Sequence, residues 1–281
     1  MAWYTTKIIN YTFLYLCTII EFSSLCYLFY ALSRRNSPIR QAYFIISILG
    51  YIIDFTTKLS AIITYEGKFK SVILWHDVFL FGIITFVLSL NRYTAIAYWK
   101  DHSRFWSFWP TCAWCVFLLA YPVIVDIGFL ASDPNGFFCL PNHPFRVANE
   151  NCPNVYIRIG FRQCASSVIT MIGSLILNAL TIMKIRKTSA PQIATKLFIQ
   201  SCVSNAIFTV FVITLVFNCL MWIHADTADQ MLKQVNNMIC NLSNYIRQSV
   251  NMIWLVVITR SVIRTSKHIV VSTTVTSSTT K

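Results

Sequence analysis

Residues 72–94 read VILWHDVFLFGIITFVLSLNRYT, an apolar run that ends on Asn91-Arg92-Tyr93. About 20 apolar residues are enough for a helix to cross the hydrocarbon core of a bilayer. The stretch therefore predicts a transmembrane helix with an arginine at its foot. An arginine there commonly anchors a helix to lipid headgroups. It can also be a working part of the protein, and the rest of the chain bears on which role applies.

The whole chain has the composition of a membrane protein. Of its 281 residues, 56% are hydrophobic and 12% are charged, and the mean hydropathy is +0.59. Seven segments have the length of a span: about 8–32, 41–63, 71–97, 107–131, 161–183, 197–222 and 237–259. These runs are too continuous and too long for barrel strands of about ten residues. The sequence predicts an all-α membrane protein, a bundle of seven transmembrane helices (1–265) followed by a Ser/Thr-rich tail (266–281).

Basic residues near the segment ends indicate the orientation. If the N-terminus is outside, the inner ends carry about twice as many Lys and Arg as the outer ends. Because cytoplasmic loops are enriched in these residues, we expect an extracellular N-terminus and a cytoplasmic C-terminus. The net charge of +13 then reflects topology and contact with anionic lipid, and we expect no nucleic-acid partner. The tail is expected to be disordered and solvated, and its hydroxyls could also accept phosphate.

Several ionisable residues fall inside the predicted spans. Such a residue costs about 3 kcal/mol or more at mid-bilayer unless it is paired or hydrated. If the first, second and seventh spans are neighbours, their charged residues form one neutral cluster, which Asn251 can join. The cluster either fixes helix packing or changes partners when the bundle switches state. Its members are Glu21, Asp54, Lys58, Arg247 and Asn251.

Polar residues at the outer ends of the third and sixth spans suggest a ligand pocket. They are His76, Asp77, Asn218 and Trp222. Polar groups around an apolar bundle mouth are what a small-ligand cavity offers. Trp222 is equally typical of the membrane interface.

The cysteines divide by expected compartment. Cys139 and Cys152 lie in the predicted outer loop (131–160), where the surroundings are oxidising, and we expect a disulfide between them. The other eight lie in or beside predicted spans, where a thiol packs as a small hydrophobe. Cys112-x-x-Cys115 has redox or metal spacing, but it falls inside a predicted span and has no second pair.

Motifs of the common enzyme classes are missing from the sequence. It contains no G-x-x-x-x-G-K-[ST], H-E-x-x-H or G-x-S-x-G. We expect no catalytic residues, no cofactor and no metal site. A zinc hydrolase built from the histidines placed outside the membrane would lack ligand spacing.

Three passages carry a resemblance to a known family. Residues 88–106 (LSLNRYTAIAYWKDHSRFW), 174–187 (SLILNALTIMKIRK) and 196–199 (KLFI) resemble the third-helix exit, the fifth-helix exit and the sixth-helix start of the nematode serpentine receptors of class gamma. These are chemosensory G-protein-coupled receptors. The resemblance implies that Asn91, Arg92 and Tyr93 form the cytoplasmic switch that engages a Gα subunit.

The sequence also departs from better-known receptors. Asn91 replaces an acid, so the restraint on Arg92 is either weaker or borrowed from the sixth span. Residues 251–255 (NMIWL) lack the proline and tyrosine of the usual seventh-helix pattern. No cysteine lies at the outer end of the third span, and a bridge between Cys139 and Cys152 would replace the usual one.

These observations predict a chemosensory receptor that binds a small external molecule and signals through a heterotrimeric G protein. By the resemblance it belongs in the plasma membrane of a sensory neuron, and pairing of two copies is left open. The alternative is a seven-helix ion channel or solute transporter whose path is lined by the intramembrane charges.

Overall fold

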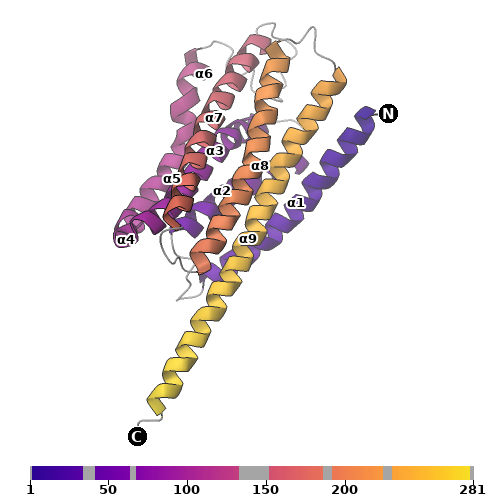
Figure 1. Cartoon of the computed structure of the whole chain (residues 1–281). Coiled ribbons are helices and arrows are strands. Elements are labelled where there is room, and N and C mark those ends of the chain that lie inside the picture. Colours follow the sequence, from indigo (N-terminus) through magenta and orange to yellow (C-terminus); the bar gives the residue numbers. More distant parts are fainter. Residues whose placement is uncertain are drawn as a thin grey trace.

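The computed structural model describes residues 2–33, 42–63, 68–132, 152–185, 192–223 and 230–278. These are helical except for the short turns at 98–101 and 106–107 (Figure 1). No strand occurs in these ranges. The elements are α1 (Ala2–Ser33), α2 (Ala42–Ile63), α3 (Lys68–Ala97), α4 (His102–Phe105), α5 (Phe108–Pro122), the π-helix η2 (Val123–Ile127), α6 (Gly128–Ser132), α7 (Cys152–Ile185), α8 (Gln192–Ile223) and α9 (Gln230–Ser278).

Six stretches of the described residues are long and apolar enough to cross a membrane. They are Tyr4–Ser33, Ala42–Ile63, Val72–Ala97, Phe108–Ile127, Ile157–Ile185 and Phe198–Met221. Large apolar side chains stand exposed on their outer surfaces, such as Ile19, Ile63, Val116 and Ile213, each at least 60% exposed. In water such a surface would be unfavourable, and lipid covers it at no cost. The prediction of a helical membrane protein is confirmed.

The helix α9 is the most polar of the long helices, but its polarity is one-sided. Asn236, Arg247 and Asn251 are buried, whereas Ile253 and Val257 on the same helix are about half exposed. The helix turns its polar face into the bundle and its apolar face outward. It also continues to Ser278, past the bundle (Figure 1), where a disordered tail from 266 was expected. No proline or glycine interrupts residues 230–278, so no residue there breaks the helix.

The long helices α1, α2, α3, α7, α8 and α9 form a closed ring in that order. Around the ring, α1 packs on α2 and α9, α9 on α8, and α8 on α7. The helix α3 contacts α2, α5, α7 and α8, and α5 lies on the outer side of α2 and α3. The N-terminus lies at one end of the bundle and α4 at the other, with the C-terminus beyond α4 (Figure 1). Arg92, near the end of α3, is therefore at the α4 end.

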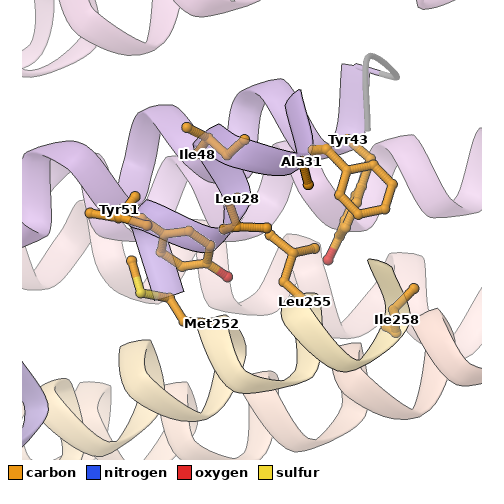
Figure 2. Packing of buried hydrophobic residues seen from close by; sticks show 10 residues of the cluster. Leu28, Ala31, Tyr43, Ile48, Tyr51, Met252, Leu255 and Ile258 are labelled. Atoms are coloured by element: carbon orange, nitrogen blue, oxygen red, sulfur yellow. The ribbon is translucent and has the colours of Figure 1, made fainter. Parts of the chain in front are cut away.

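The packing of α1, α2 and α9 buries a continuous apolar cluster (Figure 2). Leu28 and Ala31 of α1 meet Ile48 and Tyr51 of α2 and Leu255 of α9. Leu28 and Leu255 are fully buried. This cluster positions the polar faces of the same three helices, which build the candidate site.

Glycines allow α3 to approach its neighbours closely. A Cβ on Gly50 of α2 would lie 2.7 Å from Ile84 Cδ1, and one on Gly173 of α7 would lie 2.8 Å from the Phe86 ring. Real Cβ atoms do not come this close, so a larger residue would require the Ile84 side chain or the Phe86 ring to move.

A π-turn interrupts the fourth predicted span (107–131). Pro122 lacks a backbone N–H and ends the regular ladder of α5, and η2 follows directly. The turn places Asp126 in the interior, where its carboxylate accepts a hydrogen bond from Trp75 Nε1 (2.6 Å) and pairs with Arg162. These contacts join η2 to α3 and α7.

Candidate functional site

A cavity with charged walls lies among α1, α2, α3 and α9, at the end of the bundle that holds the N-terminus. Its volume is about 350 Å³, near the lower end of the range of about 300–1,000 Å³ for small-molecule sites. We call it the large cavity. Its lining residues are Lys7, Asn10, Tyr11, Leu14, Asp54, Thr57, Lys58, Ser60, Ala61, Leu74, Asn241, Asn244 and Tyr245.

Two members of an ion-paired cluster, Asp54 and Lys58, form part of this lining. The Lys58 ammonium pairs with Glu21 of α1 and lies 2.6 Å from Asp54 Oδ2 on its own helix. Ser249 of α9 also donates to Glu21 Oε1 (3.2 Å). All three charged side chains are at most 2% exposed. One cation shared between two carboxylates holds α1 and α2 together through a buried pair.

Several acceptor atoms of the large cavity have no hydrogen-bond partner in the structure. They are Asn10 Oδ1, Asn244 Oδ1 and Asp54 Oδ1. Buried acceptors are normally satisfied by a donor from the protein, from water or from a ligand. The cavity is therefore suited to a small molecule that carries hydrogen-bond donors, with Leu14, Ala61 and Leu74 offering apolar contact.

Three of the residues expected to line a ligand pocket, His76, Asp77 and Asn218, do not line the large cavity. The His76 ring lies 3.0 Å from the Leu119 carbonyl of α5, and Asn218 Oδ1 accepts a hydrogen bond from Asn236 of α9 (2.6 Å). Asp77 is buried and does not line the large cavity. His76 and Asn218 instead contact groups on neighbouring helices, because the rotation of α3 and α8 about their axes points these side chains toward them. Trp222 lies in α8, and its side chain falls outside the described residues, as does the Cys139–Cys152 pairing.

Arg247 stands apart from the Glu21–Asp54–Lys58 cluster that it was expected to neutralise. Its guanidinium lies 3.4 Å from the centre of the Phe81 ring and donates to Thr85 of α3. Ser204 of α8 lies 3.5 Å from its Nε. The guanidinium points toward α3 and α8, whereas Ser249, two residues along α9, points toward α1. The predicted single cluster is thus divided between two faces of α9.

Arg92 is buried and held by α2. It donates to Tyr43 Oη, and its guanidinium carbon lies 4.8 Å from the centre of the Tyr43 ring. Only 8% of Arg92 is exposed, so it does not reach out as a headgroup anchor. Asn91 is buried with its Nδ2 unpartnered, and Tyr93 packs edge-on against Tyr98. The restraint that an acid before Arg92 would provide comes instead from a tyrosine on the second helix.

A chain of hydrogen bonds continues from Arg92 into the bundle. Tyr43 Oη donates to Gln200 Oε1 of α8 (3.2 Å), and Gln200 Nε2 donates to the Asn251 carbonyl of α9 (3.3 Å). Asn251 Nδ2 then donates to Ser204 Oγ (2.9 Å), the same hydroxyl that faces Arg247. Four helices therefore share one buried polar network.

Two important contacts were missed at the level of sequence. In the sequence Tyr43 looks like an ordinary aromatic residue of the core. Only its position opposite Arg92 shows that it holds the guanidinium. Asp126 and Arg162 carried a usable signal, since an acid inside one predicted span and a base at the start of the next can pair. Within the described residues, no group of three or more His, Cys, Asp or Glu is arranged to hold a metal ion.

Comparison of the chain with protein-family models and with curated proteins finds no match. The chemistry of the large cavity and of the Arg92 network is therefore what bears on function.

Proposed function

We propose that this protein is a seven-span chemoreceptor, with α9 as the seventh span and the N-terminus outside. It binds a small external molecule in the large cavity and signals through a heterotrimeric G protein at the α4 end. The resemblance of residues 88–106 to serpentine receptors of class gamma supports the same function. In that case Arg92 and Tyr93 face the G protein, and the protein lies in the plasma membrane of a sensory neuron.

The observation that carries the proposal is that α9 takes part in two separate polar clusters, one beside the large cavity and one that leads to Arg92. Lys58 and Asp54 line the large cavity, and Lys58 is tied through Glu21 to Ser249 of α9. Two residues earlier on α9, Arg247 faces the network that ends at Arg92. A ligand that moves α9 relative to α1 and α2 changes both sets of contacts. Such a ligand shifts the population between two packings by its difference in affinity for them.

Ligand chemistry follows from the unpartnered acceptors. A small amine, amide or alcohol would donate hydrogen bonds to the Asn10 and Asn244 side-chain oxygens. An anionic compound would be repelled by the Asp54 carboxylate. Transport is the second candidate, because charged residues lie inside the bundle. The cavity beside Arg92 and Arg247 has a volume of only about 30 Å³, which is room for one or two water molecules and not for an organic solute. This favours transmission of a signal over passage of a solute.

The test is a second-messenger assay on intact cells exposed to a panel of small amines, amides and alcohols. We expect a compound that activates the wild-type protein to lose its effect in Arg92→Ala at equal surface expression. Arg158→Ala is the matched control, because Arg158 is exposed near the start of α7, at the end of the bundle opposite α4, and it should keep the response. Asn244→Leu should raise the half-effective concentration about tenfold through the loss of one hydrogen bond. A ligand-evoked current that persists without any G protein would contradict the proposal and favour a channel.

A further inference from the structure

A second, smaller cavity lies at the centre of the bundle, enclosed by α2, α3, α8 and α9. We call it the small cavity, and its volume is about 30 Å³. Its lining includes Ser89 and Arg92 of α3, Asn205 of α8 and Arg247 of α9. Each of these side chains is at most 8% exposed.

The charge on the walls of the small cavity is positive. Both Arg92 and Arg247 line it, and no carboxylate of the described residues does. The buried carboxylates nearby have other partners: Lys58 holds Glu21 and Asp54, and Arg162 holds Asp126. Among the described residues, Asp54 and the buried Asp77 of α3 act electrostatically on Arg247 at a distance, but neither is part of the lining. Two guanidinium groups thus face one small space without a counter-charge in its wall.

Hydrogen-bond donors around the small cavity are also left over. Arg247 Nη1, Arg92 Nε, Ser89 Oγ and Asn205 Nδ2 are buried with no hydrogen-bond partner in the structure. The Asn205 amide oxygen is unpartnered as well. A buried donor without a partner costs about 1–3 kcal/mol, and more when it is charged. Residues with unpartnered donors, on α3, α8 and α9, therefore surround one small space.

The arginine at the centre of this site is held in place by its other contacts. The Arg247 guanidinium lies over the rings of Phe81 and Phe208, at 3.4 and 4.8 Å from their centres. Thr85 Oγ1 accepts a hydrogen bond from Arg247 Nη2, and Ser204 Oγ lies 3.5 Å from Arg247 Nε. Such a fixed guanidinium loses little freedom when it binds a ligand.

We propose that the small cavity binds a monatomic anion, with chloride as the natural occupant. Two cationic groups and the Ser89 and Asn205 donors select an anion. The volume admits one or two particles the size of water, which leaves no room for phosphate or for larger organic anions. The bound anion joins α9 to α3 and α8 beside Arg92, and so stabilises the packing in which Arg92 is buried. This binding concerns the folded bundle itself and does not depend on the proposed signalling.

The experiment measures the thermal stability of the purified full-length protein in lipid nanodiscs. Sodium chloride is replaced by sodium gluconate at constant ionic strength, because gluconate is too large for the cavity. We expect a saturable rise in Tm of about 3 °C with chloride, reproduced by bromide and by choline chloride. Equal Tm values in chloride and gluconate would overturn the proposal.

Variants locate the effect. Ser89→Ala removes one donor and should raise the half-saturating chloride concentration about tenfold. Ser243→Ala is the matched control, because Ser243 is buried on α9 but donates to Ile239 of its own helix, and it should respond like the wild type. An unchanged chloride response in Ser89→Ala would place the anion elsewhere and refute the assignment.

Crystals grown in bromide give a readout that needs no variant. An anomalous peak within hydrogen-bond distance of Arg247 and Ser89 is the expected result. Water in the cavity with no anomalous peak would contradict the proposal.

Discussion

Tyr43 supplies the restraint on Arg92 that the residue before the arginine does not. Asn91 carries no charge. The Tyr43 hydroxyl accepts a hydrogen bond from the Arg92 guanidinium, which lies over the Tyr43 ring. The same hydroxyl reaches Gln200 of α8. A single phenolic oxygen therefore joins α2, α3 and α8 at the end of the bundle where we expect the G protein.

Tyr43→Phe should raise signalling in the absence of ligand. The variant keeps the ring and removes the hydroxyl, and a hydrogen bond to a charged group is worth about 1.5–3 kcal/mol. The population with Arg92 released should therefore increase about tenfold or more. The measurement is basal second-messenger output per receptor at the cell surface. Tyr15→Phe, at an exposed position of α1, is the control, and equal basal output in both variants would contradict the role of Tyr43.

The Glu21–Asp54–Lys58 cluster depends on its one cation. Lys58→Met leaves two carboxylates buried side by side, and breaking a buried pair costs about 3–5 kcal/mol. We expect a marked loss of folded protein at the cell surface, and recovery when Glu21→Gln and Asp54→Asn are added. Lys100→Met, at an exposed lysine, should have no effect. Normal expression of Lys58→Met alone would show that the cluster is not needed for folding.

At the scale of elements, a few side-chain contacts fix the positions of neighbouring helices. The π-turn after Pro122 brings Asp126 to Trp75 and Arg162, so one irregular turn fixes α3, α5 and α7. At the other end of the bundle, α4 is fixed to α3 by Thr94, whose hydroxyl accepts from Trp106 Nε1 (2.8 Å) and lies 3.3 Å from His102 Nδ1.

The connection through α4 should respond to pH. Partial burial lowers the pKa of His102 below its ordinary value of 6.5. The unfolded chain then binds a proton at a higher pH than the folded protein does. Stability is fully present above about pH 6.5 and is lost as the pH falls from there to the lowered pKa. We expect Tm to drop between pH 7.5 and 5, and the drop to shrink in His102→Phe. An unchanged pH profile in that variant would contradict this origin.

The helices α7 and α8 should be joined by mild oxidation. Cys164 Sγ and Cys219 Sγ lie 2.7 Å apart, within reach of a disulfide. Molecular oxygen with a copper–phenanthroline catalyst takes two electrons and two protons from the two thiols. With a protease site placed in the α7–α8 connection, the two fragments should stay together after cleavage until a reductant is added. In Cys164→Ser the two fragments should separate with or without oxidation. Cross-linking that survives this substitution would involve another pair of cysteines.

As a whole, the described part of the molecule buries many charged and polar side chains beside its apolar core, and it exposes many large apolar ones. The buried residues include Glu21, Asp54, Lys58, Arg92 and Arg247, whereas isoleucine and phenylalanine stand on the surface. This is the arrangement of a helical protein in lipid, where polar groups find partners only inside the bundle.

The number of spans can be tested through the termini. If α9 is the seventh span, the two ends of the chain lie on opposite sides of the membrane. An N-terminal epitope tag should then bind antibody on intact cells, and a C-terminal tag only after permeabilisation. Both tags on one side would reduce the count to six spans, and an inside N-terminus would contradict the receptor function.

The sequence alone determined the helices, because an apolar run of span length has few options other than a helix in a bilayer. It also predicted one cluster of Glu21, Asp54, Lys58 and Arg247 if the first, second and seventh spans were neighbours. The first three residues do pair, and Arg247 does not join them. Only the tertiary structure decided where Arg247 and Arg92 point, and which helices enclose the cavities. These depend on the rotation and order of the helices, which are set by close contacts such as Gly50 on Ile84 and Tyr43 on Arg92. Such contacts join residues far apart in the chain, and no periodicity in the sequence records them.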